Sequence, residues 1–244
     1  MTIRVLTSHL VPMLADLLHT AESDADGGAV AGVLLHSDQG AFGVEPGKTS
    51  LLVGTSTDTT VVGHTWTQAS GSLPPMLWGI EDVRAAIAVC KPLYRNEKTH
   101  VTIIDREGDR IVLREDPKLF GDGAELSFPA GKLNDFPRSL WQLLSDVHMR
   151  PAVRGENGHP LPAVPRTDFL PRRLTPFIKI AHSRGENLSL FTYHQFLPVL
   201  VQIGETYRGA VIPSRWPESW SGDEPDADLW PADLPPVPPA TKAA

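Results

Sequence analysis

Residues 198–215 read PVLVQIGETYRGAVIPSR, and they carry the clearest structural signal in the chain. Mainly apolar residues, rich in Val and Ile, lie on both sides of Gly204-Glu205, a pattern typical of two strands joined by a tight turn. Residues 188–193 supply a further strand. Before them, Thr175-Pro176 predicts a helix start, with Thr as the cap and Pro at the first position, and residues 177–182 continue that helix. The segment is therefore interpreted as a helix followed by strands.

The same order of elements occurs near the N-terminus. Ser8 is the predicted cap of a helix that carries leucines at helical spacing, and Pro12 is expected only in its first turn, so that the helix is short. The leucines that share one face of this helix are Leu10, Leu14, Leu17 and Leu18. Strands are predicted at residues 2–6, 29–36, 51–54 and 59–68.

A second copy begins near Ile80. Glu81-Asp82 opens its helix, which we expect to end at about Lys91, before Pro92. Strands are predicted at residues 76–78, 101–104, 110–113 and 124–128. The chain therefore holds two complete βαβββ units and an incomplete third one, which predicts an α+β fold built by repetition.

Charge is distributed unevenly along the 244 residues. Residues 217–244 hold six acidic side chains and one lysine, a net charge of −5, so the net charge of −7 leaves −2 for the body. Seven of these 28 residues are proline, a composition that cannot support a core and predicts a disordered acidic tail. A nearly neutral body can still carry a basic face.

Several classes of protein are excluded by the sequence. No run approaches the roughly 20 apolar residues of a membrane span, and the N-terminus lacks the features of a signal peptide, so we expect a cytoplasmic protein that contacts no membrane. The single cysteine, Cys90, forms no internal disulfide and is expected to be a buried, inert thiol. No histidine pair has metalloprotease spacing and no phosphate-binding loop is present, which favours a protein without catalytic residues, metal or cofactor.

The predicted domain organisation follows from these patterns. A first domain of two βαβββ units covers residues 1–139, and a Pro- and Gly-rich linker covers residues 140–168. A partial C-terminal domain occupies residues 169–216, and the tail occupies residues 217–244.

Three stretches resemble the bacterial-type β sliding clamp, the processivity factor of replicative DNA polymerase. Residues 52–58 look like the family's strand that enters a T-x-T-D turn, and Asp135-Phe136-Pro137 looks like its domain exit. Residues 198–215 are similar to its closing strand and C-terminal end. The resemblance implies the DNA-clamp fold, in which helices line a central hole and curved antiparallel sheets form the outer wall. The chain is shorter than a bacterial clamp and more like the compact clamps of phages.

The resemblance also implies functions. Inner helices would meet the phosphates of encircled double-stranded DNA through long basic side chains. The candidates are Arg84, Lys91, Arg95, Arg172, Arg173, Lys179 and Arg184. An apolar groove near the C-terminus would hold peptides of DNA polymerase and other proteins with clamp-binding motifs. Its candidates are Leu174, Pro176, Val199, Val211, Ile212, Pro213, Arg215 and Trp216.

A clamp loader and a homo-oligomer are further implied partners. Twelve units close a ring in that family, so three units a chain would need four chains, and two full domains would need three. In the tail, Asp226, Asp228, Leu229 and Trp230 resemble the short peptide by which partners bind clamps, although its usual Gln is missing. We hypothesise that the tail docks in a groove of its own or a neighbouring chain; a solubilising tail is the alternative.

Two other functions remain open. One is a clamp-like decoy or adaptor that binds replication proteins without forming a ring on DNA. The other is a structural β-rich assembly protein with no DNA role, in which case the basic residues would not share a face.

Overall fold

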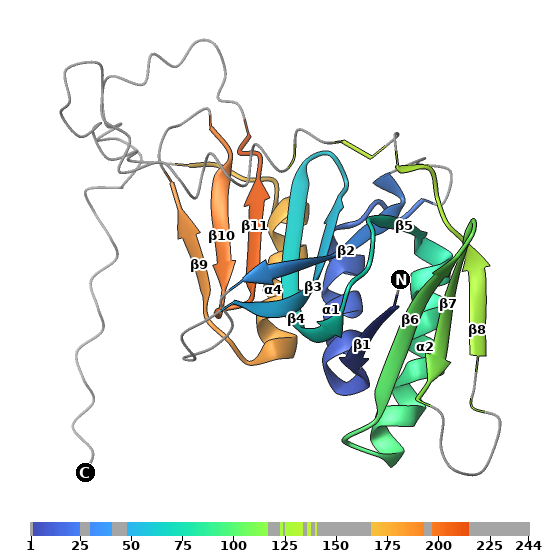
Figure 1. Cartoon of the computed structure of the whole chain (residues 1–244). Coiled ribbons are helices and arrows are strands. Elements are labelled where there is room, and N and C mark those ends of the chain that lie inside the picture. Colours follow the sequence, from blue (N-terminus) through green and yellow to red (C-terminus); the bar gives the residue numbers. More distant parts are fainter. Residues whose placement is uncertain are drawn as a thin grey trace, which may run out of the picture.

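The computed structural model describes residues 2–24, 30–40, 48–116, 123, 125–133, 136–137, 140, 167–192 and 197–214 (Figure 1). Their elements follow in the order β1 (Thr2–Leu6), α1 (Thr7–Thr20), β2 (Gly32–Gly40), β3 (Thr49–Thr57), β4 (Val61–Gly71), β5 (Met76–Gly79), α2 (Ile80–Asn96), β6 (Val101–Glu107), β7 (Arg110–Glu115), β8 (Glu125–Pro129), α4 (Pro171–Arg184), β9 (Leu188–Phe191), β10 (Val199–Ile203) and β11 (Tyr207–Val211). None of the described helices is long and apolar enough to span a bilayer.

The strands form one antiparallel sheet that forks at β4. On one side, β4 pairs along its length with β3, and β2 and β5 follow beyond. On the other side, residues 61–65 pair with β11 and residues 69–71 pair with β1. The sheet therefore continues in two branches, one through β10 to β9 and one through β6 and β7 to β8 (Figure 1).

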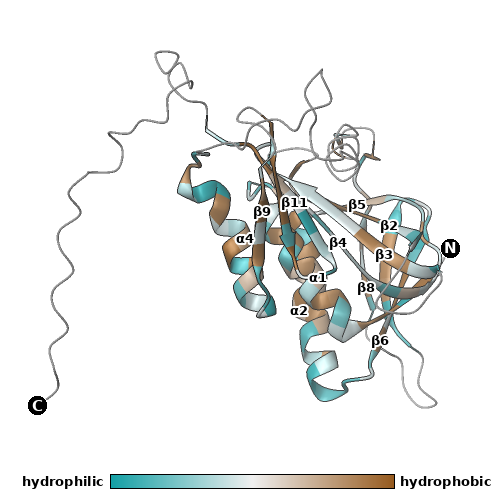
Figure 2. Cartoon of the chain, turned by 90° about the vertical axis from the view of Figure 1, so that its left-hand side faces the viewer, coloured by the Kyte–Doolittle hydropathy of each residue, from teal (hydrophilic) through white to brown (hydrophobic). Residues whose placement is uncertain are grey.

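All three described helices lie on the same face of this sheet (Figure 2). The largest core cluster fills the space between α1, α2 and the strands, and Trp78 and Phe128 meet there edge to face at 5.0 Å. A second cluster lies under α4, where Phe177 and Ile180 pack on β10 and β11. The α+β prediction of helices on one face of a curved antiparallel sheet is confirmed.

Glycines allow the helices to approach the strands closely. A Cβ on Gly54 would lie 2.4 Å from Cδ1 of Leu17, on α1. A Cβ on Gly209 would lie 2.7 Å from Cε1 of Phe177, on α4. Real Cβ atoms do not come so close to other atoms, so both helix contacts require a residue without a side chain.

The helix boundaries expected from proline were wrong. α1 begins at Thr7 with no side-chain cap, so Ser8 is not the cap, and Pro12 is its sixth residue. α2 continues past Pro92 to Asn96, and α4 begins at Pro171 rather than at Thr175-Pro176. Pro12 and Pro92 lie on the exposed side and Pro176 is half-buried, so the carbonyl that each leaves without a helix bond lies towards water. Apolar packing on the opposite side holds these helices together.

A buried ion pair joins α1 to α4. The Nη2 and Nε atoms of Arg184 each lie 2.8 Å from Oδ2 of Asp16, which is 2% exposed. The same guanidinium donates to the hydroxyl oxygens of Thr65 and Thr206, each at 3.0 Å. Burial raises the pKa of the Asp16 carboxyl, and Arg184 opposes this rise. The pair links the third unit to the first.

We predict that Arg184→Met lowers the free energy of unfolding by about 3–5 kcal/mol at pH 7, because it leaves a buried carboxylate without its counter-ion. The pKa of Asp16 then lies above its unfolded value, so stability falls as pH rises through it, and the loss should shrink on acidification to about pH 4. Urea unfolding at both pH values measures this.

The control is the double variant Asp16→Asn/Arg184→Met, which removes both charges and should recover most of the loss. A double variant as unstable as Arg184→Met would show that the ion pair does not determine the stability of this junction.

Candidate nucleic-acid and partner interface

The exposed side of α2 carries a basic strip. Arg84, Lys91 and Arg95 are all exposed, and their spacing of seven and four residues places them within about 40° around the helix axis. Arg84 also pairs with Glu81 one turn earlier. Because Val83, Ala86 and Cys90 face the sheet, this strip points away from it.

The four cations predicted on or near α4 fall into two groups. Arg172 and Lys179 are exposed and lie seven residues apart on the side away from the sheet. Arg184 is held in the buried pair with Asp16. Arg173 donates from Nη1 to the carbonyls of Ile212 and Pro213, at 2.8 and 3.2 Å.

Between these helices, α1 presents a nearly neutral strip. Its exposed residues at helical spacing include Pro12 and His19. Although part of its side chain is exposed, partial burial, assisted by the charge of Lys179, lowers the pKa of His19, which favours the neutral ring. The helix face thus has a neutral centre between two basic strips, and the exposed cations of α2 and α4 share a face of the molecule.

Two of the motifs that resemble a clamp meet in space. The turn between β3 and β4 is held by Asp58, whose Oδ1 accepts from the amides of Thr60 and Val61, both at 2.8 Å. The carbonyl of Thr60 in turn accepts from the amide of Ile212 at 3.0 Å. The T-x-T-D turn therefore lies beside the C-terminal end of β11, where the partner groove was predicted.

The predicted groove residues differ in accessibility. Val199 and Val211 are completely buried under α4, and Pro213 is also buried. Leu174 and Pro176 are half-buried, whereas Ile212 is 44% exposed. Arg215 and Trp216 lie outside the described residues, as do Asp226, Asp228, Leu229 and Trp230 of the tail. Among the predicted apolar residues that the structure describes, Ile212 is thus the most open to a partner.

Sequence reasoning missed two exposed apolar residues beside this site. Leu170, 41% exposed, precedes α4, and Ile178, 55% exposed, lies on its outer side. Ile178 is about 100° around the helix axis from Phe177, and the helical spacing of Phe177, Ile180 and Ala181 was the signal that could have placed Ile178 off the buried side. Leu170 offered no comparable pattern.

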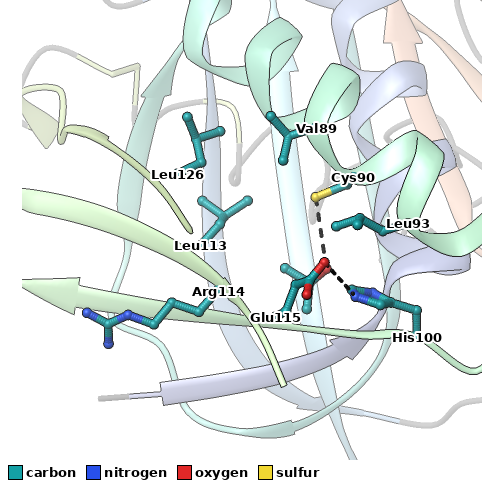
Figure 3. Close-up of a pocket in the computed structure, with 9 residues that line it drawn as sticks. Val89, Cys90, Leu93, His100, Leu113, Arg114, Glu115 and Leu126 are labelled. Carbon is teal, nitrogen blue, oxygen red and sulfur yellow. Dashed lines mark hydrogen bonds and ion pairs between the residues drawn. The ribbon is translucent and has the colours of Figure 1, made fainter. Parts of the chain in front are cut away.

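A polar cluster lies under α2. Cys90, His100 and Glu115 line a cavity of about 10 Å³ (Figure 3), and burial raises the pKa of the Cys90 thiol. The Oγ1 atom of Thr7 lies 2.7 Å from both His100 Nδ1 and Thr102 Oγ1. Thr7, at the start of α1, therefore holds the imidazole ring of His100 in place. Cys90 is buried, as predicted. Within the described ranges, no group of three His, Cys, Asp or Glu side chains could hold a metal ion.

Backbone strain is found in the turn at the candidate groove. Thr59 has a φ of 76°, and among the described residues it is the one non-glycine residue with positive φ. A β-branched residue in this region costs about 1–2 kcal/mol, and such strain is concentrated at functional sites.

We predict that Thr59→Asn raises the free energy of unfolding by about 0.5–1 kcal/mol, because Asn adopts positive φ more readily. Thr60→Asn, the control, should lower stability because Thr60 Oγ1 donates to Asp58 at 2.9 Å. Thermal unfolding of both variants measures the difference, and a loss of stability in Thr59→Asn would contradict the inferred strain.

Comparison with known proteins supports this picture at the level of the fold. No protein-family model matches the chain, and no curated protein matches its sequence. The DNA polymerase III β subunit of Thermotoga maritima matches with a TM-score of 0.59 and 13% identity, over 88% of this chain and 66% of that one. A DNA polymerase sliding clamp of Pseudomonas aeruginosa matches with a TM-score of 0.58 and 12% identity, over 89% and 66%.

A third match, the DNA polymerase III β chain of Streptococcus pneumoniae, has a TM-score of 0.60 and 11% identity, over 95% of this chain and 68% of that one. The chain thus spans about two thirds of the length of these structures. The resemblance inferred from the sequence is confirmed for the fold, and the protein has the fold of the bacterial DNA polymerase III β sliding clamps.

Proposed function

We propose that this protein is a clamp-like factor that holds duplex DNA against the helix face of its sheet and tethers a replicative polymerase at the end of β11. One observation carries the proposal: the exposed cations of α2 and α4 lie on one face, on both sides of the neutral strip of α1. In the alternative, a structural protein with no DNA role, these cations would not share a face of the molecule.

The chemistry of this face suits sliding rather than sequence recognition. Arg and Lys side chains that reach from helix surfaces meet phosphates, which carry no base information, and exposed contacts break and re-form easily. The protein itself would catalyse no reaction, and its role would be to keep a partner near DNA. Partners of this proposed clamp are a polymerase, other proteins with clamp-binding motifs and a loader, in the cytoplasm of a bacterial cell or during phage replication.

Encircling DNA would require several copies. The described chain presents three helices, and its sheet ends in β8 on one branch and β9 on the other. Each end offers a strand edge to a neighbour, and Leu190 and Phe191 are exposed on β9. A homo-oligomer joined through these edges is the assembly that we propose.

We predict that Arg84→Glu/Lys91→Glu weakens binding to a 30-base-pair duplex at least about tenfold at 50 mM salt, because it reverses two phosphate contacts. Fluorescence anisotropy measures the affinity, and the slope of log affinity against log salt should become shallower by about two.

The matched control is Arg4→Glu/Arg110→Glu. Arg4 and Arg110 alternate with the buried Ile3 and Ile111, so their side chains lie on the face opposite the helices. This variant has the same charge change and should bind nearly as the unaltered protein. Equal losses in both variants would show that net charge, and not the helix face, drives binding.

We predict that Ile212→Glu abolishes measurable binding of a peptide that carries a leucine followed by an aromatic residue, because it places a charge on the apolar anchor site. Val89→Glu, at an apolar residue of α2 that is 38% exposed, should leave the affinity unchanged. Isothermal titration calorimetry measures both. Peptide binding by a protein that binds no DNA would favour the adaptor or decoy.

A further inference from the structure

No other element of the described residues covers the exposed side of α4, which carries a defined pattern of side chains. Arg172, Thr175, Lys179 and His182 are exposed and follow one another at spacings of three and four residues. Ile178, beside this row, is 55% exposed. We call these five residues the α4 strip. It combines positive charge with one apolar side chain, and it ends at the helix N-terminus, where the helix dipole adds further positive potential.

Ser214, three residues before the acidic tail, lies next to this surface. The amide of Ser214, the last described residue, donates to the carbonyl of Asp168 at 2.7 Å. Asp168 is four residues before Arg172, so the chain continues from a point beside the basic end of α4. Residues 217–244 then follow with six acidic side chains and one lysine.

The lengths of the two partners agree. From Arg172 to His182 the α4 strip covers about 15 Å, at 1.5 Å a residue. Five of the tail's acids lie between residues 218 and 228, and a flexible segment of this length has a root-mean-square extension of about 16–19 Å. A segment tethered this close has an effective concentration in the millimolar range, so even weak contacts become occupied.

We propose that residues 217–244 dock on the α4 strip of their own chain and compete there with DNA phosphates. Acidic side chains would pair with Arg172 and Lys179, and Leu229 or Trp230 would cover Ile178. The competition with DNA rests on the proposed function, whereas the docking itself does not. The α2 strip lies beyond α1 and would stay accessible, so the tail would weaken DNA binding without abolishing it.

Docking is tested first, without DNA. A synthetic peptide of residues 217–244 is added to protein that ends at residue 216, and amide chemical shifts are followed by NMR. We expect shifts at Arg172, Ile178 and Lys179, with small changes at Arg84 and Lys91. Arg172→Glu/Lys179→Glu should remove these shifts, while Arg84→Glu/Lys91→Glu, matched in charge, should keep them. Absent shifts, or shifts centred on α2 or on Ile212, would overturn the proposal.

Competition is tested with the full chain. Converting the six tail acids to their amides, at unchanged length, should raise affinity for a 30-base-pair duplex by about three- to tenfold at 50 mM salt, with the difference vanishing near 0.5 M. If both proteins bind DNA equally, competition is wrong. If neither binds DNA, the proposed function fails, and the NMR result still decides docking.

Discussion

The double pairing of β4 is the constraint on which the rest of this structure depends. The strand bonds to β3 along one edge, and along the other it bonds first to β11 and then to β1. Two strands cannot occupy the same edge, so they must diverge, and the sheet must branch. The branches position α2 and α4 on either side of α1, and the two basic strips follow from that placement.

Much of the fold could be predicted because strands obey a simple rule. Runs of apolar and β-branched residues between turn residues located the strands, including β10 and β11. Helix ends were harder to predict because each proline was taken to mark the start or the end of a helix. In α1 and α2 the ring lies on the water side, where a missing backbone bond costs little and the apolar side still packs. Whether a proline inside a helix faces water or the core depends on how the helix packs, and a single sequence does not give that packing.

The residues of the candidate site also fall into those that a single element places and those that depend on tertiary packing. Arg84, Lys91 and Arg95 could be assigned to one strip because their spacing is a property of a single helix. Arg173 and Arg184 could not be separated from the exposed cations, since their partners lie 39 and 168 residues away. Only the pairing of β11 with β4 brings Asp16 and the carbonyl of Ile212 to them. Which charges are exposed is therefore a tertiary property.

The contacts of the third unit with the first have a consequence for how copies of this chain associate. They include five residue pairs between β11 and β4, the Arg184–Asp16 pair, the bond from Arg184 to Thr65 and the bond from Ile212 to Thr60. Leu140, which lies between β8 and α4, packs against Val62, Leu200 and Ala210, but none of the strand pairings, ion pairs or hydrogen bonds named here involves that connection. The third unit of one molecule can therefore pair with β4 of another and form every one of these contacts again. Such a domain-swapped dimer needs no new interface, and protein concentration during folding decides between it and the monomer.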